Sequence, residues 1–362
     1  METISTIAAA PGLAVRLRRA CAAVGAVALS CGVYRLAPYN RENLGRLVGT
    51  ESFHFTGEQF LLFAAVAYAL AAIVYHLVAP DLGPTKSLRF FRVIGALVRS
   101  PTAMLRRGLE RDDRVALLTT LLKGYFGPMM AMSLMFFCVG ALAHGASVVA
   151  SIRAGDSVFS LLDEHGFRML MQAILFVDVF FFTVGYLVES PRLGNQIRSV
   201  DPTLLGWAAA MACYPPFNTV TSAILGFSAS DFPRFDDPTV HLALNIALLV
   251  LMAIYASASA ALGLKASNLT HRGIVSRGPY AVIRHPAYTC KNMAWWIGSI
   301  PLISLSFSQS FLAGLLAVAT VTGWSMLYVL RALTEEDHLR SVDGEYAAYA
   351  AKVRYRFIPG VF

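Results

Sequence analysis

The chain has 362 residues, of which 56% are hydrophobic and 14% charged, and its formal net charge is +8 at pH 7. The apolar residues come in blocks of about the 20 residues that a helix needs to cross a bilayer, which indicates a multi-pass membrane protein. The basic residues lie between these blocks and not along an aromatic-rich face, so nucleic acid is not an expected partner. The five cysteines show neither paired nor metal-ligand spacing, so we expect no disulfide framework and no metal site.

Eight apolar segments predict an all-α, polytopic transmembrane helical bundle. They cover residues 20–37, 60–79, 124–147, 169–188, 204–226, 240–263, 292–308 and 311–330. The alternate connections between them hold 23 lysines and arginines on one side and five on the other. Because basic residues concentrate in cytoplasmic loops, both termini are predicted to be cytoplasmic. We expect a bacterial-type inner membrane or an endomembrane, with the first helix retained, since no cleavage site follows it.

The N-terminal region, residues 1–230, holds about five of these spans and has no predicted role of its own. The segment Leu88–Arg111 places aromatic and arginine side chains on different helical faces, which is typical of a helix in the lipid headgroups; a specific lipid or partner site is the alternative. Asp178 lies deep in an apolar span. It is either structural, being protonated or paired with a polar neighbour, or part of a proton or substrate path. Pro215 and Pro216 are predicted to interrupt the fifth span.

The connection at 264–291 is polar and rich in helix breakers. Gly273 and the pair Gly278-Pro279 predict a turn-rich strip over 272–280, whose backbone groups are free to bind a ligand. His285 precedes Pro286, which suits the first turn of the next helix. The start of that helix favours a carboxylate or a phosphate.

The C-terminal tail is predicted to meet this connection on the same side of the membrane. Arg331 and Glu335 are four residues apart and share one helical face, and Tyr346 and Tyr349 share another. An arginine there can neutralise an anionic group, and a glutamate can hold a cationic or hydroxyl-rich ligand. Each of these residue types is also common as an interfacial lipid anchor.

The ordered series GxxSRGPYxxIRHPxY, RxxxEE, GxYxxY and VRYRxIPG resembles the isoprenylcysteine carboxyl methyltransferase and phospholipid methyltransferase superfamily. These are integral membrane enzymes that use S-adenosylmethionine, and the resemblance covers about residues 240–362. It implies a cytoplasmic cofactor pocket enclosed by the C-terminal hairpin and tail. It also implies a lipid-like or hydrophobic methyl acceptor that enters from the bilayer.

The resemblance also assigns roles to individual residues. Arg331 matches an arginine that faces the methyl acceptor. Apart from the resemblance, an amine acceptor would have to be left unprotonated, and Glu336 or His338 is then a candidate base. The implied cofactor contacts are Lys265, Arg272, Gly273, Ile274, Val275, Tyr280, His285, Pro286, Ala287, Tyr288 and Glu335. The chain departs from the family pattern at Cys290, where relatives usually have glycine, and Lys291 is unusual beside a cationic cofactor.

Two other functions stay open at this stage. The tail also looks like that of membrane sterol reductases, which would make the chain an NADPH-dependent oxidoreductase. Alternatively, the C-terminal region is inactive and the N-terminal helices carry the function of a transporter or a structural membrane protein. Asp178 and the break at Pro215-Pro216 support this alternative. The sequence does not distinguish whether the methyl acceptor is a carboxylate, a thiolate or an amine.

Overall fold

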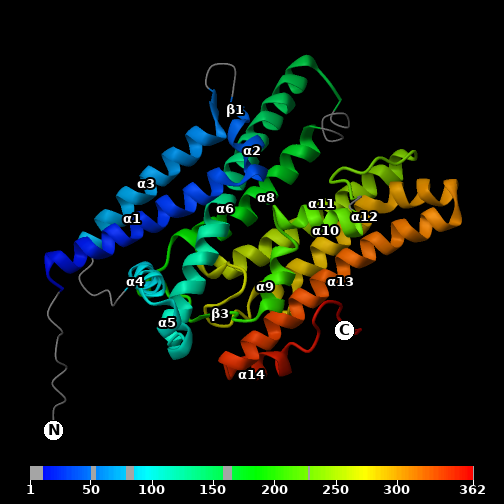
Figure 1. The fold of residues 1–362 in the computed structure, drawn as a ribbon. Helices are drawn as coiled ribbons and strands as arrows, with labels where there is room; N and C mark the ends of the chain where they lie inside the picture. Colours follow the sequence, from blue (N-terminus) through cyan, green and yellow to red (C-terminus); the bar gives the residue numbers. More distant parts are fainter. Residues whose placement is uncertain (1–10, 50–53, 79–84, 158–164, 227–228, 362) are drawn as a thin grey trace, which may run out of the picture. The chain divides into compact units, whose positions relative to one another are not determined.

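The computed structural model describes residues 11–49, 54–78, 85–157, 165–226 and 229–361, and the chain is mostly helical (Figure 1). It divides into two compact units, one formed by Met1–Val48 with Ser52–Met132 and the other by Gly49–Glu51 with Ser133–Phe362. The second unit is larger than the predicted C-terminal region 240–362. Helices that precede residue 230 pack with that region and complete it.

The first unit is built from helices and one pair of short strands. Its elements are α1 (Leu13–Leu36), α2 (Arg41–Gly45), β1 (Leu47–Gly49), β2 (His54–Thr56), α3 (Gly57–Val78), α4 (Lys86–Arg99), α5 (Pro101–Arg107) and the first part of α6 (Arg111–Ala154), with a 3-10 turn at Pro38–Asn40. Helix α1 packs against α3 and α4.

The predicted amphipathic segment at 88–111 is helical but not continuous. The Thr85 hydroxyl accepts a hydrogen bond from the Leu88 N–H and caps α4, and Pro101 starts α5 after a break at Ser100. Phe90 is buried on the inner face of α4. Its placement in lipid headgroups stays a prediction.

The second unit contains the remaining elements. They are the end of α6, α8 (Phe167–Leu187), β3 (Ser199–Val200), α9 (Leu204–Met211), α10 (Phe217–Leu225), α11 (Pro238–Leu262), β4 (Thr270–His271), α12 (Pro286–Gln309), α13 (Phe311–Val342) and α14 (Glu345–Lys352), with 3-10 turns at Pro191–Leu193, Gly263–Lys265 and Gly278–Ala281. The interruption at Pro215 and Pro216 is confirmed, because α9 ends before these prolines and α10 starts after them.

Helix α11 lies between α8 and α12, and α12 forms a hairpin with α13 (Figure 1). The hairpin turns at Ser310, whose hydroxyl accepts a hydrogen bond from the Ala313 N–H at 3.1 Å and caps α13. A core of buried apolar side chains joins α8, α11 and α12. Its members are Phe167, Met171, Phe232, Leu248, Met252 and Ala294.

Among the described helices, five are long and apolar enough to cross a membrane, and a sixth span results if α1 and the bent segment after it count as one. They are Gly57–Val78, Arg111–Ala154, Phe167–Leu187, Pro238–Lys265 and Phe311–Val342. A multi-pass integral membrane protein is therefore supported, and the prediction of eight spans is not confirmed. The segment 204–226 is split into two short helices, and α12 carries Lys291 and several serines, which lower its apolar character.

Candidate functional site

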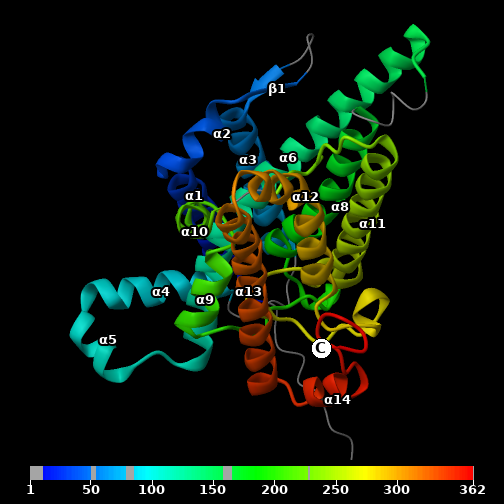
Figure 2. The same ribbon diagram turned by 90° about the vertical axis from the view of Figure 1, so that its right-hand side faces the viewer.

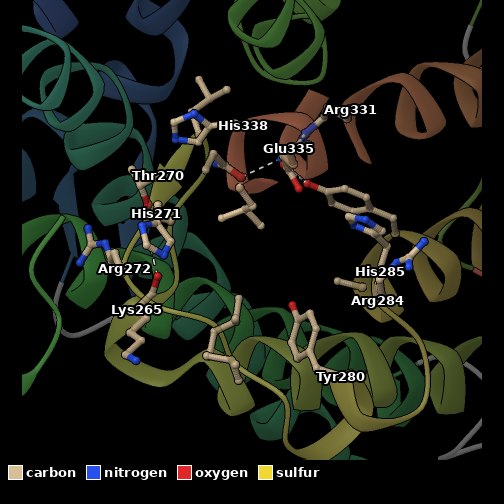
Figure 3. A pocket seen from close by; sticks show the side chains of 18 of the residues that line it. Lys265, Thr270, His271, Arg272, Tyr280, Arg284, His285, Arg331, Glu335 and His338 are labelled. Carbon is tan, nitrogen blue, oxygen red and sulfur yellow. Dashed lines mark hydrogen bonds and ion pairs between the residues drawn. The ribbon is translucent and has the colours of Figure 1, made fainter. Parts of the chain in front are cut away.

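One cavity of about 190 Å³ lies within the second unit. Its wall comes from α8, α11, α12, α13 and α14, from the connection 263–285 between α11 and α12, and from Asp201 and Tyr214. Most of the predicted site residues line it (Figure 3): Lys265, Arg272, Gly273, Ile274, Val275, Tyr280, His285, Ala287, Tyr288, Arg331 and Glu335. The fold thus brings the connection before α12 and the end of α13 to one space, although the sequence separates them by more than 40 residues.

A short antiparallel pairing holds the first part of the connection. Ser199 of β3 lies opposite His271 of β4, and the Arg198 N–H donates to the His271 carbonyl at 2.8 Å. Close packing fixes the residues before β4, because a Cβ at Gly185 would lie only 2.1 Å from the Ala266 carbonyl oxygen. The strip therefore has little freedom to move away from α8.

The guanidinium of Arg272 supports this strip and is 3% exposed. Its two terminal nitrogens donate to the Asn195 carbonyl at 2.9 Å and to the Gly185 carbonyl at 2.7 Å, which belongs to the last turn of α8. The Gly185 carbonyl lies in the last turn of α8, where carbonyls lack helical partners, so the arginine satisfies it and complements the negative end of the helix. The side chain of Arg272 is thus used for support.

The next residues offer backbone groups to the cavity. Gly273 has φ +95°, a conformation that side chains other than glycine rarely adopt. Between Gly273 and Val275, no backbone N–H or carbonyl forms a hydrogen bond within the described part of the chain. Half-buried backbone groups without partners favour a ligand, so this strip can act as a binding edge of the cavity.

Tyrosines border the other side of the connection. The hydroxyl of Tyr280 points into the cavity (Figure 3), and the Tyr349 hydroxyl donates to the Tyr280 carbonyl at 2.9 Å. Burial, reinforced by the nearby charge of Glu335, raises the pKa of Tyr280 above its usual value. Burial also raises the pKa of Tyr349, to about 12. Both hydroxyls are therefore neutral donors at physiological pH.

Glu336 lies outside the cavity wall, at the centre of a cluster of charged groups. Its carboxylate is fully buried and lies 2.9 Å from Arg284 Nε, 3.1 Å from His285 Nε2, 2.6 Å from an Arg340 nitrogen and 3.2 Å from Arg356 Nε. The structure therefore brings Glu336 to its neighbours and not to the cavity. Pro286, the first residue of α12, is likewise absent from the wall.

This cluster ties the tail to the start of α12. The Arg284 N–H donates to the Tyr355 carbonyl at 3.0 Å, and the His285 N–H donates to the Arg356 carbonyl at 2.9 Å. The C-terminal tail accordingly runs beside the connection that precedes α12 (Figure 2). The ring of His285 stacks on Tyr288 with centroids 5.5 Å apart, so the cluster also orients an aromatic ring of the wall.

Arg331 is 2% exposed and lies among aromatic rings. Its guanidinium carbon is 4.8 Å from the Tyr288 ring centroid, and a terminal nitrogen donates to Asn268 Oδ1 at 2.7 Å. Glu335 Oε1 accepts a hydrogen bond from the Tyr288 hydroxyl and lies 3.6 Å from Arg331 Nε. One arginine, one carboxylate and one tyrosine thus form a connected group in the cavity wall.

Sequence reasoning missed the residues that hold Arg331. Asn268 binds it directly, and the hydroxyl of Tyr186 in turn accepts from the Asn268 N–H at 2.7 Å. Tyr214, in the break between α9 and α10, places its ring 5.5 Å from the guanidinium. A buried asparagine beside a helix-breaking strip was the available signal for Asn268; Tyr214 gave none.

Two histidines stand on the polar side of the cavity. His338 Nε2 lies 3.1 Å from the Ser199 hydroxyl, and His271 Nε2 lies 2.7 Å from an Asp343 oxygen. Burial lowers the pKa of His271, and the neighbouring carboxylate opposes that shift. His338, the alternative base of the sequence analysis, therefore lines the cavity where Glu336 does not.

Asp178 is paired within the membrane helices. It is 4% exposed, and its two oxygens accept hydrogen bonds from the hydroxyls of Tyr255, at 2.7 Å, and Ser259. Both hydroxyl residues line the cavity. This is the pairing that the first interpretation of Asp178 expects, while a role in a proton or substrate path stays untested.

Comparison with known proteins gives one family match. The model of a family described as "Protein of unknown function (DUF1295)" matches residues 223–353, about a third of the chain. This is a family of membrane proteins that includes steroid 5-alpha reductase-like members, and no methyltransferase family model matches. No curated protein and no solved structure matches the chain.

Proposed function

We propose that this chain is an integral membrane methyltransferase that uses S-adenosylmethionine and acts on a lipid-like or hydrophobic acceptor. The observation that carries the proposal is the convergence of separate motif segments on one cavity. The strip 272–288 and the pair Arg331 and Glu335 supply its wall together. These are the segments in which the sequence resembles the membrane methyltransferases.

The chemistry of the wall fits such a cofactor. Open backbone groups between Gly273 and Val275 suit the hydrogen-bonding edges of a nucleoside. The Glu335 carboxylate suits an amino group or a ribose hydroxyl, and the rings of Tyr280 and Tyr288 suit a sulfonium, because aromatic faces attract cations. Each of these groups lies on the cavity in the structure.

S-adenosylmethionine would supply an activated methyl group on a sulfonium, which makes a good leaving group. The contribution of the chain is then to hold the acceptor in line and to exclude water. Arg331, fixed by Asn268 and by aromatic rings, is suited to orient the acceptor. Glu336 acts through Arg284 and His285, so we propose it as a positioning residue, with no direct role as a base.

The second candidate is an NADPH-dependent membrane reductase. The family match favours it, because that family includes steroid 5-alpha reductase-like members. The distribution of cations weighs against it, since the phosphates of NADPH need several cationic partners. Among the cations of the cavity wall, Arg272 binds backbone carbonyls, Arg284 binds Glu336, and Arg331 binds Asn268 and lies beside Glu335. Among the described residues this leaves Lys265 and Lys291 without such partners.

Equilibrium binding of labelled cofactors to purified protein in lipid nanodiscs tests the proposal. We expect saturable binding of S-adenosylmethionine and none of NADPH. Glu335→Gln should weaken binding by about 10-fold or more, because a charge-assisted hydrogen bond contributes about 1.5–3 kcal/mol.

The matched control is Asp337→Asn. Asp337 lies two residues further along α13, and its side chain is 77% exposed. The Asp337→Asn variant should bind S-adenosylmethionine with the same affinity as the unchanged protein. If the folded protein bound NADPH saturably and did not bind S-adenosylmethionine, the reductase would be the better account.

A further inference from the structure

The cavity wall carries a lysine that the proposed cofactor contacts do not use. Lys291 lies in the second turn of α12 and lines the cavity. Its ammonium nitrogen is 5.3 Å from the Trp295 ring centroid, 5.7 Å from that of Tyr328 and 5.8 Å from that of Tyr255. The charge is therefore surrounded by aromatic faces, which attract cations but leave all three N–H donors open.

Lys291 has no hydrogen bond or ion pair with any residue that the structure describes. Two acids interact electrostatically with the lysine: Asp231, which does not line the cavity, and Asp178 in α8. The two oxygens of Asp178 already accept hydrogen bonds from Tyr255 and Ser259, and Asp178 itself does not line the cavity. The lysine thus presents a positive charge to the cavity without a contacting anion.

Arg331 adds a second positive charge beside one of the same rings. Its guanidinium carbon lies 5.4 Å from the ring centroid of Tyr328, the ring that Lys291 also approaches. Glu335 balances Arg331 only in part, because the separation of 3.6 Å exceeds that of a good hydrogen bond and the carboxylate also accepts from Tyr288. Lys291 and Arg331 therefore place two positive charges beside the ring of Tyr328, and only Arg331 has a carboxylate of the wall, that of Glu335, close to it.

We propose that Lys291, together with Arg331, forms a subsite for the anionic head group of a hydrophobic ligand. A carboxylate or a phosphate would complete the open N–H donors of both cations, and its apolar chain would lie along the aromatic wall. An amine head group would meet two like charges in a site of low dielectric, which disfavours it. The inference rests on the proposed function in one respect, because it assigns the negative charge to the methyl acceptor.

The subsite can be tested without any methyl donor. Binding of four ten-carbon probes to the protein in zwitterionic nanodiscs is measured by calorimetry, with protein-free nanodiscs as the blank: decanoate, decyl phosphate, decylamine and decanol. We expect decanoate or decyl phosphate to bind about 10-fold or more tightly than decylamine, as a charge-assisted contact predicts. The two anionic probes distinguish a carboxylate from a phosphate ligand.

Three variants assign this preference to the lysine. Lys291→Met should abolish the advantage of the anionic probes and leave decanol binding unchanged. Lys291→Glu should favour decylamine, a reversal that loss of packing alone does not produce. Lys123→Met is the control, since Lys123 is a half-buried lysine of α6 that does not line the cavity; it should behave like the unchanged protein.

Two results would overturn the inference. One is unchanged discrimination between decanoate and decylamine in folded Lys291→Met and Lys291→Glu. The other is weaker binding of S-adenosylmethionine in Lys291→Met with undiminished binding of both anionic probes, because the lysine would then hold the carboxylate of the cofactor. If charge-selective binding holds but no methyl transfer occurs, the subsite stands and the proposed function fails.

Discussion

Replacing Glu336 with alanine should lower the free energy of unfolding by about 3–5 kcal/mol, because removal of one partner from a buried ion cluster leaves the others uncompensated. The carboxylate is fully buried and lies within 3.2 Å of Arg284, His285, Arg340 and Arg356. Three of these four residues belong to the start of α12 and to the tail. Their shared anchor would be lost, so binding of S-adenosylmethionine should weaken as well.

Denaturant unfolding in mixed micelles, followed by near-ultraviolet circular dichroism, measures this loss. Asp337→Ala is the matched control, since its exposed carboxylate forms one ion pair of 3.4 Å with the half-exposed Arg340. An exposed pair of this kind contributes only about 0–1 kcal/mol. Equal stability losses in the two variants would show that the cluster does not hold the tail to α12.

Replacing Arg331 with lysine should reduce the turnover rate by about 100-fold, while the affinity for S-adenosylmethionine changes little. Lysine keeps the charge but not the planar guanidinium, which donates to Asn268 and lies against the rings of Tyr214, Tyr288 and Tyr328. A displaced acceptor loses alignment with the methyl group, and a displacement of about 1 Å can cost that factor.

Steady-state kinetics, combined with a separate measurement of cofactor binding, distinguishes the orientation of the acceptor by Arg331 from a structural role. Arg354→Lys, a conservative change of an exposed arginine in the tail, should leave both quantities unchanged. If Arg331→Lys weakened cofactor binding and left turnover at saturating cofactor intact, Arg331 would contact the cofactor and not the acceptor.

Much of the helical architecture could be predicted from the sequence, because apolar block length and helix breakers act locally. The break at Pro215 and Pro216 and the helix start at Pro286 follow from the missing N–H of proline. The number of membrane spans was harder to predict than the helix boundaries. Segments such as 204–226 are apolar enough, but whether they form one helix depends on the break and on packing.

The predicted site residues largely meet at one cavity, but their side-chain directions were not predictable. Consecutive residues of a helix point about 100° apart, so Glu335 faces the cavity while Glu336 faces the charged cluster. The sequence alone does not show which of these two glutamates faces the cavity. Arg272 likewise matched a cofactor position, although its guanidinium binds carbonyls at the end of α8, a partner more than 80 residues away.

The support that Asn268 and Tyr214 give to Arg331 depends on long-range packing that no local pattern encodes. Tyr214 comes from the interrupted segment between α9 and α10, which the sequence analysis assigned to a region without a role. The second unit explains this contribution, since α8, α9 and α10 belong to the same compact body as the C-terminal helices.

Methyl transfer from S-adenosylmethionine with a trideuterated methyl group, in the presence of a total lipid extract, tests the central claim most directly. Mass spectrometry should find a lipid-soluble product that carries one trideuteromethyl group, formed by the unchanged protein and strongly reduced in Arg331→Lys. No labelled product from folded protein, together with an NADPH-dependent product that has gained two hydrogens, would contradict the account.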